Sequence, residues 1–279
     1  MPKAKVNGVE LNYEVHGDGY PLVLAHGYTA SLQMWADQIP AFAQKYRVVV
    51  YDNRGHGASE APSDPAQYDL WTCVEDQAAL MDHLDISEAY VGGLSMGGMI
   101  AMRFALRYPQ RVRALLLCDT EPGLGGPHRD WLNALYGSAG PLVRTEGVGG
   151  WLKRMWPVVA QAFPPEDQLP AGVRRHIEGL GSMSANGFLG GAQALREQDN
   201  VLERLSEIRV PTLIIVGDKD LFLGPSRAMQ ERIAGSQFVL IRDSLHGTAV
   251  WQPQAFTKAV LDFLAQVDAG RPVAGERVL

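Results

Sequence analysis

Short apolar runs that alternate with helical patterns are the feature that most constrains the fold of this chain. Five such runs lie at 22–25, 48–51, 115–118, 213–216 and 238–241, and a Gly, Pro or Asp lies within two residues of each. Runs of this kind are typical of strands that are buried on both faces. Apolar residues three to four apart predict helices over 70–84 and 256–263. The alternation predicts an α/β fold, in which a mostly parallel central sheet is flanked by helices.

The N-terminal residues predict a different kind of pairing. Asn7-Gly8 suits a tight turn with positive φ, and residues 9–15 alternate between apolar and polar types. We therefore expect an antiparallel hairpin at the edge of the sheet.

The alternation stops between about residues 121 and 205. More than 80 residues is too long for a structureless loop, so we expect a helical cap insertion here. The core is then divided into 1–121 and 207–279, with the insertion at 122–206. The aromatic side chains of this segment either pack within it or line a substrate pocket; they include Trp131, Tyr136, Trp151 and Trp156.

Composition excludes several classes of protein. The 279 residues are 46% hydrophobic and carry a formal net charge of −6, which fits a globular domain and gives no reason to expect a nucleic-acid partner. Cys73 and Cys118 are too few for a disulfide framework and have no metal-ligand spacing, so we expect small buried residues. There is no apolar stretch behind Lys3 and Lys5 and no run of ~18 apolar residues. We expect a cytoplasmic protein without a membrane span, and the sequence does not indicate its oligomeric state.

The motif Gly93-x-Ser95-x-Gly97 carries the chemistry. It follows a short apolar strand and precedes a helical run, the context in which this pattern exposes a nucleophilic serine. The glycines allow a sharp turn, and the free N–H groups of the helix that follows face a developing anion.

A serine nucleophile needs a base and an acid that orients the base. His246 follows the last apolar run and is the expected base, whereas His26 and His56 are expected to fix loops. Asp218 and Asp220 both follow the run 213–216; the deeper position in the turn favours Asp220, and Asp119 is a third candidate.

With these motifs the chain resembles the α/β-hydrolase family almost from end to end. The matching segments are His26-Gly27-Tyr28, Asp52-x-Arg54-Gly55-His56-Gly57-x-Ser59, Gly93-x-Ser95-x-Gly97, Gly217-x-x-Asp220 and His246-Gly247. The resemblance implies a Ser95–Asp220–His246 triad and an oxyanion hole made by the backbone N–H groups of Tyr28 and Met96. It implies no metal and no organic cofactor. For Asp52 and Arg54 we expect a structural role in the turn rather than contact with substrate.

The resemblance implies acyl transfer on a small-molecule ester or lactone. The first hypothesis is a hydrolase of small or medium uncharged carboxylic esters, and perhydrolysis is a side activity of some similar proteins. The alternative is a lactonase similar to 3-oxoadipate enol-lactonases, or a carbon–carbon bond hydrolase of aromatic degradation. These act on acidic substrates, for which basic residues of the insertion would be needed: Arg129, Arg144, Lys153, Arg154, Arg174 and Arg175.

Three other activities of the family and one non-catalytic role are further alternatives. Dehalogenases and epoxide hydrolases of the family place Asp at the elbow, so Ser95 argues against them, whereas hydroxynitrile lyases can keep the serine triad. A non-catalytic receptor with the same fold has no need for Ser95, Asp220 and His246 together.

Overall fold

The computed structural model describes residues 2–123, 129–130, 133 and 139–279, and within them nine strands form one sheet. The order across the sheet is β1-β2-β4-β3-β5-β6-β7-β8-β9. The strands are β1 (Lys3–Val6), β2 (Val9–His16), β3 (Tyr20–Ala25), β4 (Tyr46–Tyr51), β5 (Ala89–Leu94), β6 (Val112–Cys118), β7 (Thr212–Gly217), β8 (Gln237–Ile241) and β9 (Gly275–Val278). β2 pairs antiparallel with β1 and β4, and all other neighbours are parallel. The predicted α/β fold is therefore confirmed.

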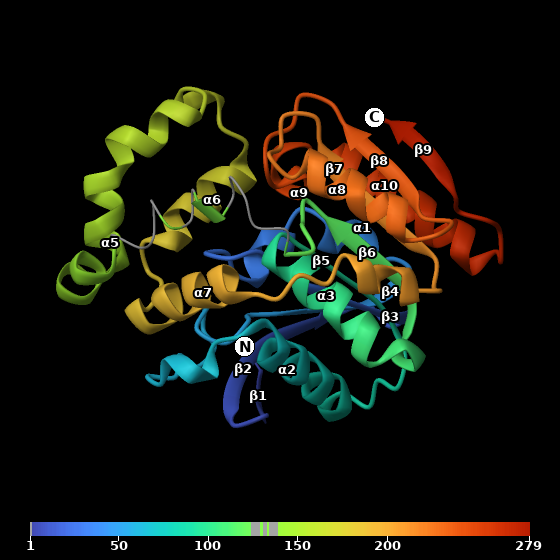
Figure 1. Cartoon of the computed structure of the whole chain (residues 1–279), viewed down its shortest axis with the longest axis horizontal. Helices are drawn as coiled ribbons and strands as arrows, with labels where there is room; N and C mark the ends of the chain where they lie inside the picture. The colour runs from blue at the N-terminus through green and yellow to red at the C-terminus, as the bar shows by residue number, and fades with distance from the viewer. Residues whose placement is uncertain (1, 124–128, 131–132, 134–138) are drawn as a thin grey trace.

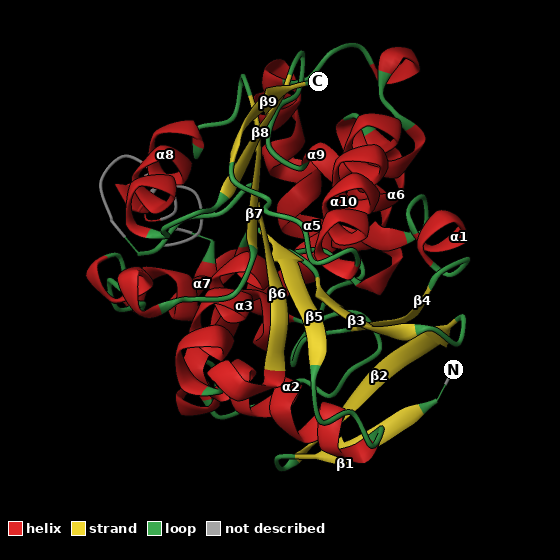
Figure 2. Ribbon diagram, turned by 90° about the vertical axis from the view of Figure 1, so that its right-hand side faces the viewer, coloured by secondary structure: helices red, strands yellow, loops and turns green. Residues whose placement is uncertain are grey.

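Helices cover both faces of the sheet (Figure 2). The α-helices are α1 (Ile39–Phe42), α2 (Leu70–His83), α3 (Met96–Arg107), α5 (Gly140–Val159), α6 (Ala171–Leu180), α7 (Ala185–Glu197), α8 (Leu223–Arg232), α9 (Thr248–Trp251) and α10 (Pro253–Asp268). The 3₁₀ turns are η1 (Leu32–Trp35), η2 (Pro65–Gln67), η3 (Pro109–Arg111), η4 (Ala160–Ala162), η5 (Glu166–Gln168) and η6 (Glu203–Glu207).

Burial on two faces explains why the central strands read as continuous apolar runs. In β6, Leu115 and Leu117 join the core cluster formed with α2, α3 and α8. Leu116 and Cys118 point to the opposite cluster, which includes α1, α9 and α10. Since successive side chains of a strand point to opposite faces, every position of β6 in this stretch must be apolar.

The N-terminal hairpin forms as predicted. Val6 pairs with Val9, and the two turn residues between them, Asn7 and Gly8, have φ angles of 43° and 79°. Both angles lie in the left-handed region that a tight hairpin turn requires. Cys73 and Cys118 are buried and unbonded to each other, in agreement with their expected role as small core residues.

The chain between β6 and β7 contains α5, α6 and α7, which lie together at one side of the sheet (Figure 1). α6 contacts α9 and η1, whereas α7 contacts η2 and α5. Trp151 on α5 is 4% exposed and packs with Phe188 on α7, so this aromatic residue belongs to a small core of its own. Trp131 and Tyr136 lie outside the described residues.

Among the described helices, none combines the length and apolar character that crossing a membrane requires.

The strand β9 is an element that the sequence patterns did not predict. It pairs parallel with β8 at the end of the sheet, and two ion pairs attach it there: Arg227 with Glu276 at 2.6 Å and Arg277 with Asp262 at 2.9 Å. Its four residues, Gly-Glu-Arg-Val, are mostly exposed and carry no apolar run, which is why periodicity does not reveal it.

Candidate active site

Ser95 occupies a strained turn between β5 and α3. Its φ and ψ angles are 57° and −117°, and its side chain is half-buried. Such a backbone conformation is rare for a residue with a side chain, and strain of this kind concentrates at functional sites. Ser95 N–H donates to the Cys118 carbonyl at 2.9 Å, and the Thr120 hydroxyl donates to the Ser95 carbonyl at 2.7 Å, so β6 holds the turn on one side.

The glycines on either side of Ser95 are required by close backbone contact. A Cβ atom at Gly93 would lie 2.3 Å from the carbonyl carbon of Gly97, and a Cβ atom at Gly97 would lie 2.1 Å from the Ala25 carbonyl oxygen. No real Cβ approaches backbone this closely. The turn can therefore fold only because both residues lack a side chain.

His246 and Asp220 meet in a direct hydrogen bond. His246 Nδ1 donates to Asp220 Oδ2 over 2.9 Å, and Phe222 N–H donates to the other carboxylate oxygen at the same distance. The Asp220 side chain is fully buried, whereas 39% of the His246 side chain is exposed. The Phe222 ring packs against the imidazole at a steep angle. Both residues follow the carboxyl ends of parallel strands, as does Ser95, so all three lie along one edge of the sheet.

The contact between them moves the pKa of each group. Burial raises the pKa of Asp220, but the positive charge of His246 and the hydrogen bonds outweigh it, and the net shift is downward. Burial lowers the pKa of His246, but the Asp220 carboxylate outweighs that effect and the net shift is upward. The pair thus stabilises a protonated imidazole beside an ionised carboxylate.

Of the three candidate acids, Asp220 contacts His246, and the other two brace the turns around it. Asp218 accepts a hydrogen bond from Ser244 N–H at 3.1 Å. Asp119, which is fully buried, accepts from Thr248 N–H at 2.8 Å, from the Thr248 hydroxyl at 2.6 Å and from Gly217 N–H at 3.2 Å. Asp119 therefore ties the turn that carries Asp220 to the turn that carries His246.

Asp119 differs from Asp220 in its ionisation. Burial, and then the negative charge of Asp220, raise the pKa of Asp119 to about 8. Two carboxyl groups close together in a buried place cannot both ionise readily, so the proton stays on the one that is further from the imidazole. Asp119 is the third candidate acid in the sequence. In the structure it connects Gly217 and Thr248 by hydrogen bonds.

The loop 26–29 lies directly against Ser95. A Cβ at Gly27 would be 3.3 Å from the Ser95 Cβ. His26 Nε2 accepts from Asn53 N–H at 3.0 Å, and its Nδ1 lies 2.7 Å from the Gly27 carbonyl, so the ring holds this loop against the next turn. Burial lowers the pKa of His26 to about 4, and His26 is therefore neutral at pH 7.

The side chain of Tyr28 is held by the segment that follows β6. Its hydroxyl donates to the Phe188 carbonyl, and its ring contacts those of Phe188 and His56. Met96, the other expected oxyanion donor, is the first residue of α3 and is buried. The backbone N–H groups of Tyr28 and Met96 thus belong to two segments that adjoin Ser95.

The turn after β4 is structural, as expected for its charged residues. Asp52 accepts from Leu32 N–H at 2.7 Å and Ala58 N–H at 2.9 Å, which closes two loops on one carboxylate. Arg54 makes two hydrogen bonds of 2.6 Å to the Asp76 carboxylate, and both side chains are 2% exposed. Neither charged group is available to a substrate.

Among the described residues, the other histidines and the basic residues of the insertion do not contact Ser95, Asp220 or His246 in any hydrogen bond or ion pair. His16 pairs with Glu14 at 2.8 Å, and His83 packs edge-on against Tyr13. His128 lies outside the described residues. The basic residues of the insertion are exposed or have partners: Arg129 donates to Gln198, Arg154 pairs with Glu146, Arg174 donates to Leu169, Arg175 pairs with Asp37, and Arg144 and Lys153 are exposed.

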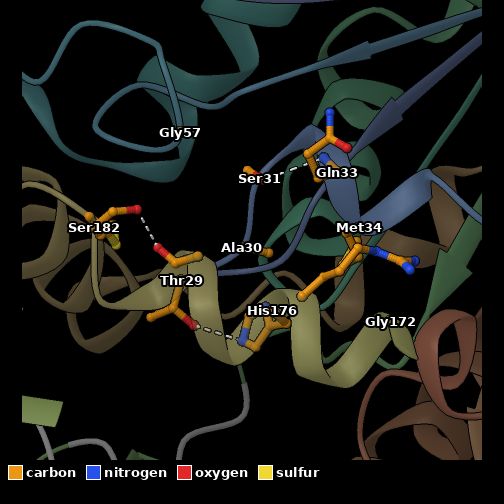
Figure 3. Close-up of a pocket in the computed structure, with 12 residues that line it drawn as sticks. Thr29, Ala30, Ser31, Gln33, Met34, Gly57, Gly172, His176 and Ser182 are labelled. Atoms are coloured by element: carbon orange, nitrogen blue, oxygen red, sulfur yellow. Dashed lines mark hydrogen bonds between the residues drawn. The ribbon is translucent and has the colours of Figure 1, made fainter. Parts of the chain in front are cut away.

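His176 is a residue that the sequence analysis did not single out. It lies on α6 and lines a cavity of about 100 Å³ together with Thr29 of the loop 26–29 (Figure 3). Its Nε2 is 3.5 Å from the Thr29 hydroxyl. No local pattern links residues 29 and 176, so only the folded chain reveals the contact.

Among the described residues there is no cluster of three His, Cys, Asp or Glu side chains that could hold a metal ion.

The geometry can be set beside known proteins. A family model for the alpha/beta hydrolase fold matches residues 20–139. A 3-oxoadipate enol-lactonase of Acinetobacter baylyi is 33% identical over 264 residues, which cover 90% of this chain and 92% of that protein. An enol-lactonase from Burkholderia xenovorans, known from its crystal structure, is 30% identical with a TM-score of 0.79, and the match covers 95% of this chain and 100% of that one. A thermophilic esterase from Thermogutta terrifontis is 29% identical with a TM-score of 0.82, and the match covers 96% of this chain and 99% of that one.

Proposed function

The chain belongs to the alpha/beta hydrolase fold family, and on that premise we propose that it cleaves small or medium carboxylic esters through an acyl-enzyme intermediate on Ser95. The observation that carries the proposal is the 2.9 Å hydrogen bond between His246 and Asp220, at the same edge of the sheet as the strained turn of Ser95. A hydroxyl group becomes a good nucleophile only when an oriented base removes its proton.

In the proposed reaction, His246 Nε2 takes the hydroxyl proton while the Ser95 oxygen attacks the ester carbonyl carbon. Asp220, which keeps Nδ1 protonated, stabilises the imidazolium that results. His246 then passes the proton to the alcohol oxygen as the carbon–oxygen bond breaks, and the acyl group stays on Ser95. A water molecule then gives a proton to His246 and attacks the acyl carbon. His246 returns this proton to the Ser95 oxygen as the bond between that oxygen and the acyl carbon breaks, which releases the acid and the free enzyme.

The tetrahedral intermediate carries a negative oxygen that needs hydrogen-bond donors. We assign this role to the backbone N–H groups of Tyr28 and Met96. Gly27 packs against Ser95, which brings the first donor to the reacting carbon, and Met96 begins α3, whose N-terminus favours an anion. We also assign residues 122–206 as a cap on the site, because α6 contacts α9 and η1 at the edge where His246 lies.

A lactone is the second candidate substrate. A lactone is a cyclic ester and reacts by the same steps, and both an enol-lactonase of Acinetobacter baylyi and one of Burkholderia xenovorans align with almost the whole chain.

Hydrolysis of p-nitrophenyl esters from acetate to decanoate, with a panel of five- and six-membered lactones beside them, tests both candidates. We expect an optimum at one acyl length and a loss of at least about 10³-fold in Ser95→Ala. Ser206→Ala is the matched control, because the Ser206 hydroxyl only donates to Glu203 on an exposed turn. Full activity in Ser95→Ala would show that another group is the nucleophile. Lactone turnover without ester turnover would favour the second candidate.

A further inference from the structure

A polar cavity adjoins the proposed active site on the side of the loop 26–29. It measures about 100 Å³, whereas one water needs roughly 10–15 Å³, so it can hold a group of several atoms. Its polar lining comes from two parts of the chain. The core contributes Thr29, Ser31 and Gln33, and the segment after β6 contributes Arg175, His176 and Ser182 (Figure 3).

Thr29 has a backbone conformation that its residue type disfavours. Its φ is 63°, in the left-handed region, and a β-branched residue there is a genuine outlier. Thr29 directly follows Tyr28, and its hydroxyl donates to the Tyr28 carbonyl at 2.6 Å. Strain that persists next to a proposed oxyanion donor points to a functional constraint on this position.

The hydrogen bonds of the Thr29 hydroxyl indicate which ring nitrogen of His176 carries the proton. Because the Thr29 hydroxyl hydrogen is directed at the Tyr28 carbonyl, its oxygen faces His176 Nε2 as an acceptor. We therefore assign the proton of the neutral ring to Nε2. The separation of 3.5 Å is at the outer limit of a hydrogen bond, so this N–H makes only a weak contact with Thr29.

The cavity has no uncompensated charge among the described residues that line it. Burial lowers the pKa of His176 to about 4, and the charge of the nearby His246 lowers it as well, so His176 is uncharged at pH 7. Arg175 pairs with Asp37 at 2.7 Å. A carboxylate brought here would lose its hydration without gaining an unpaired cation, whereas an uncharged acceptor would gain a donor.

We propose that Thr29 and His176 form a specificity subsite that binds an uncharged ether, hydroxyl or carbonyl oxygen of the substrate beside the oxyanion loop. The inference rests on the proposed function, since it concerns the same substrate. A substrate oxygen closer than 3.5 Å takes the His176 N–H in preference to Thr29. Thr29 directly follows Tyr28, and α6, which carries His176, contacts α9 just after His246, so the bound oxygen lies near the reacting ester.

Two pairs of isosteric esters test the subsite. p-Nitrophenyl methoxyacetate and butyrate differ by an oxygen in place of a methylene on the acyl side; 2-methoxyethyl acetate and butyl acetate differ in the same way on the alcohol side. For each pair, the ratio of kcat/KM is compared between wild type and His176→Leu, which cancels the intrinsic reactivity of the esters.

In one of the two pairs, we expect His176→Leu to lower the ether-to-methylene ratio about 2- to 10-fold, chiefly through KM. His176→Gln, which keeps an N–H donor, should retain most of the preference. Val173→Ala is the packing control, because Val173 is buried on α6 in an apolar cluster and does not line the cavity. An unchanged ratio in His176→Leu for both pairs overturns the proposal, as does an equal change in Val173→Ala.

A binding measurement separates this proposal from the proposed function. If wild type turns over none of the four esters, the ester-hydrolase assignment fails, and the same pairs are titrated calorimetrically into Ser95→Ala and into Ser95→Ala/His176→Leu. Tighter binding of the ether member that disappears in the double variant supports the subsite. Equal affinity for both members in Ser95→Ala refutes it.

Discussion

The buried ion pair between Arg54 and Asp76 allows a test of how much a single buried charge costs in free energy of unfolding. The guanidinium donates twice to the carboxylate at 2.6 Å, and both side chains are 2% exposed. A third bond joins Arg54 to the Gln67 carbonyl at 2.8 Å. Replacing Asp76 by Ala leaves a positive charge in the interior with one hydrogen bond in place of three.

The expected cost of Asp76→Ala is large because the charge of Arg54 remains buried. Removing one partner of a buried pair destabilises a protein by about 3–5 kcal/mol. A domain is commonly stable by about 5–15 kcal/mol, so the loss is a large part of the total. At about 2–4 °C per kcal/mol for a chain of this size class, Tm should fall by about 6–20 °C.

Urea unfolding followed by tryptophan fluorescence, together with calorimetry for Tm, measures the change. Arg54→Met/Asp76→Leu should recover most of the loss, because two apolar residues replace the pair without leaving a buried charge. Arg204→Ala, which removes an exposed pair with Glu207, should cost no more than about 1 kcal/mol. The reasoning is refuted if Asp76→Ala costs as little as this exposed control, or if the double variant is no more stable than Asp76→Ala.

Three further outcomes are expected. Asp119→Ala removes the acceptor of both Thr248 donors and should lower the free energy of unfolding by at least about 2 kcal/mol and reduce kcat. Asp119→Asn should retain more stability and more activity, and equal losses in the two variants would contradict the structural role of Asp119. Because a general base must be neutral, kcat/KM should fall as the pH drops through the pKa of His246, which lies above the ordinary 6.5. A kcat/KM that stays constant from pH 8 to pH 5 would argue against His246 as the base. Gly97→Ala should cost roughly 1–3 kcal/mol or more by calorimetry, since its Cβ would lie 2.1 Å from the Ala25 carbonyl, and an unchanged Tm would refute the close contact.

Local patterns predict the framework of the proposed site. Each of the three proposed triad residues follows an apolar run in a turn rich in glycine, and chain order places such turns at one edge of a parallel sheet. The choice of Asp220 over Asp218 depended on position in the turn and on the family resemblance. In the structure, Asp220 contacts His246, whereas Asp218 accepts a hydrogen bond from Ser244 N–H.

The contacts that the sequence did not reveal join segments far apart in the chain. Thr29 and His176 are separated by 147 positions, and Asp119 and Thr248 by 129. The residues around His176 in the sequence do not distinguish it from any other polar residue on an amphipathic helix. Its position beside Thr29 follows only from the way α6 packs against the loop 26–29. Periodicity reports which face of a helix is buried, not what it is buried on.

The strand β9 covers one edge of the sheet. β8 presents the apolar residues Phe238 and Val239, and its outer backbone groups pair with β9. A variant cut before residue 271 would leave that edge open, as a template for strands of other copies. In the intact chain the strand outside it carries Glu276 and Arg277, both tied into ion pairs, and charged side chains on an edge discourage further addition of strands. The strand β9, three of whose four residues are exposed, thus covers a sheet edge that strands of other copies could otherwise join.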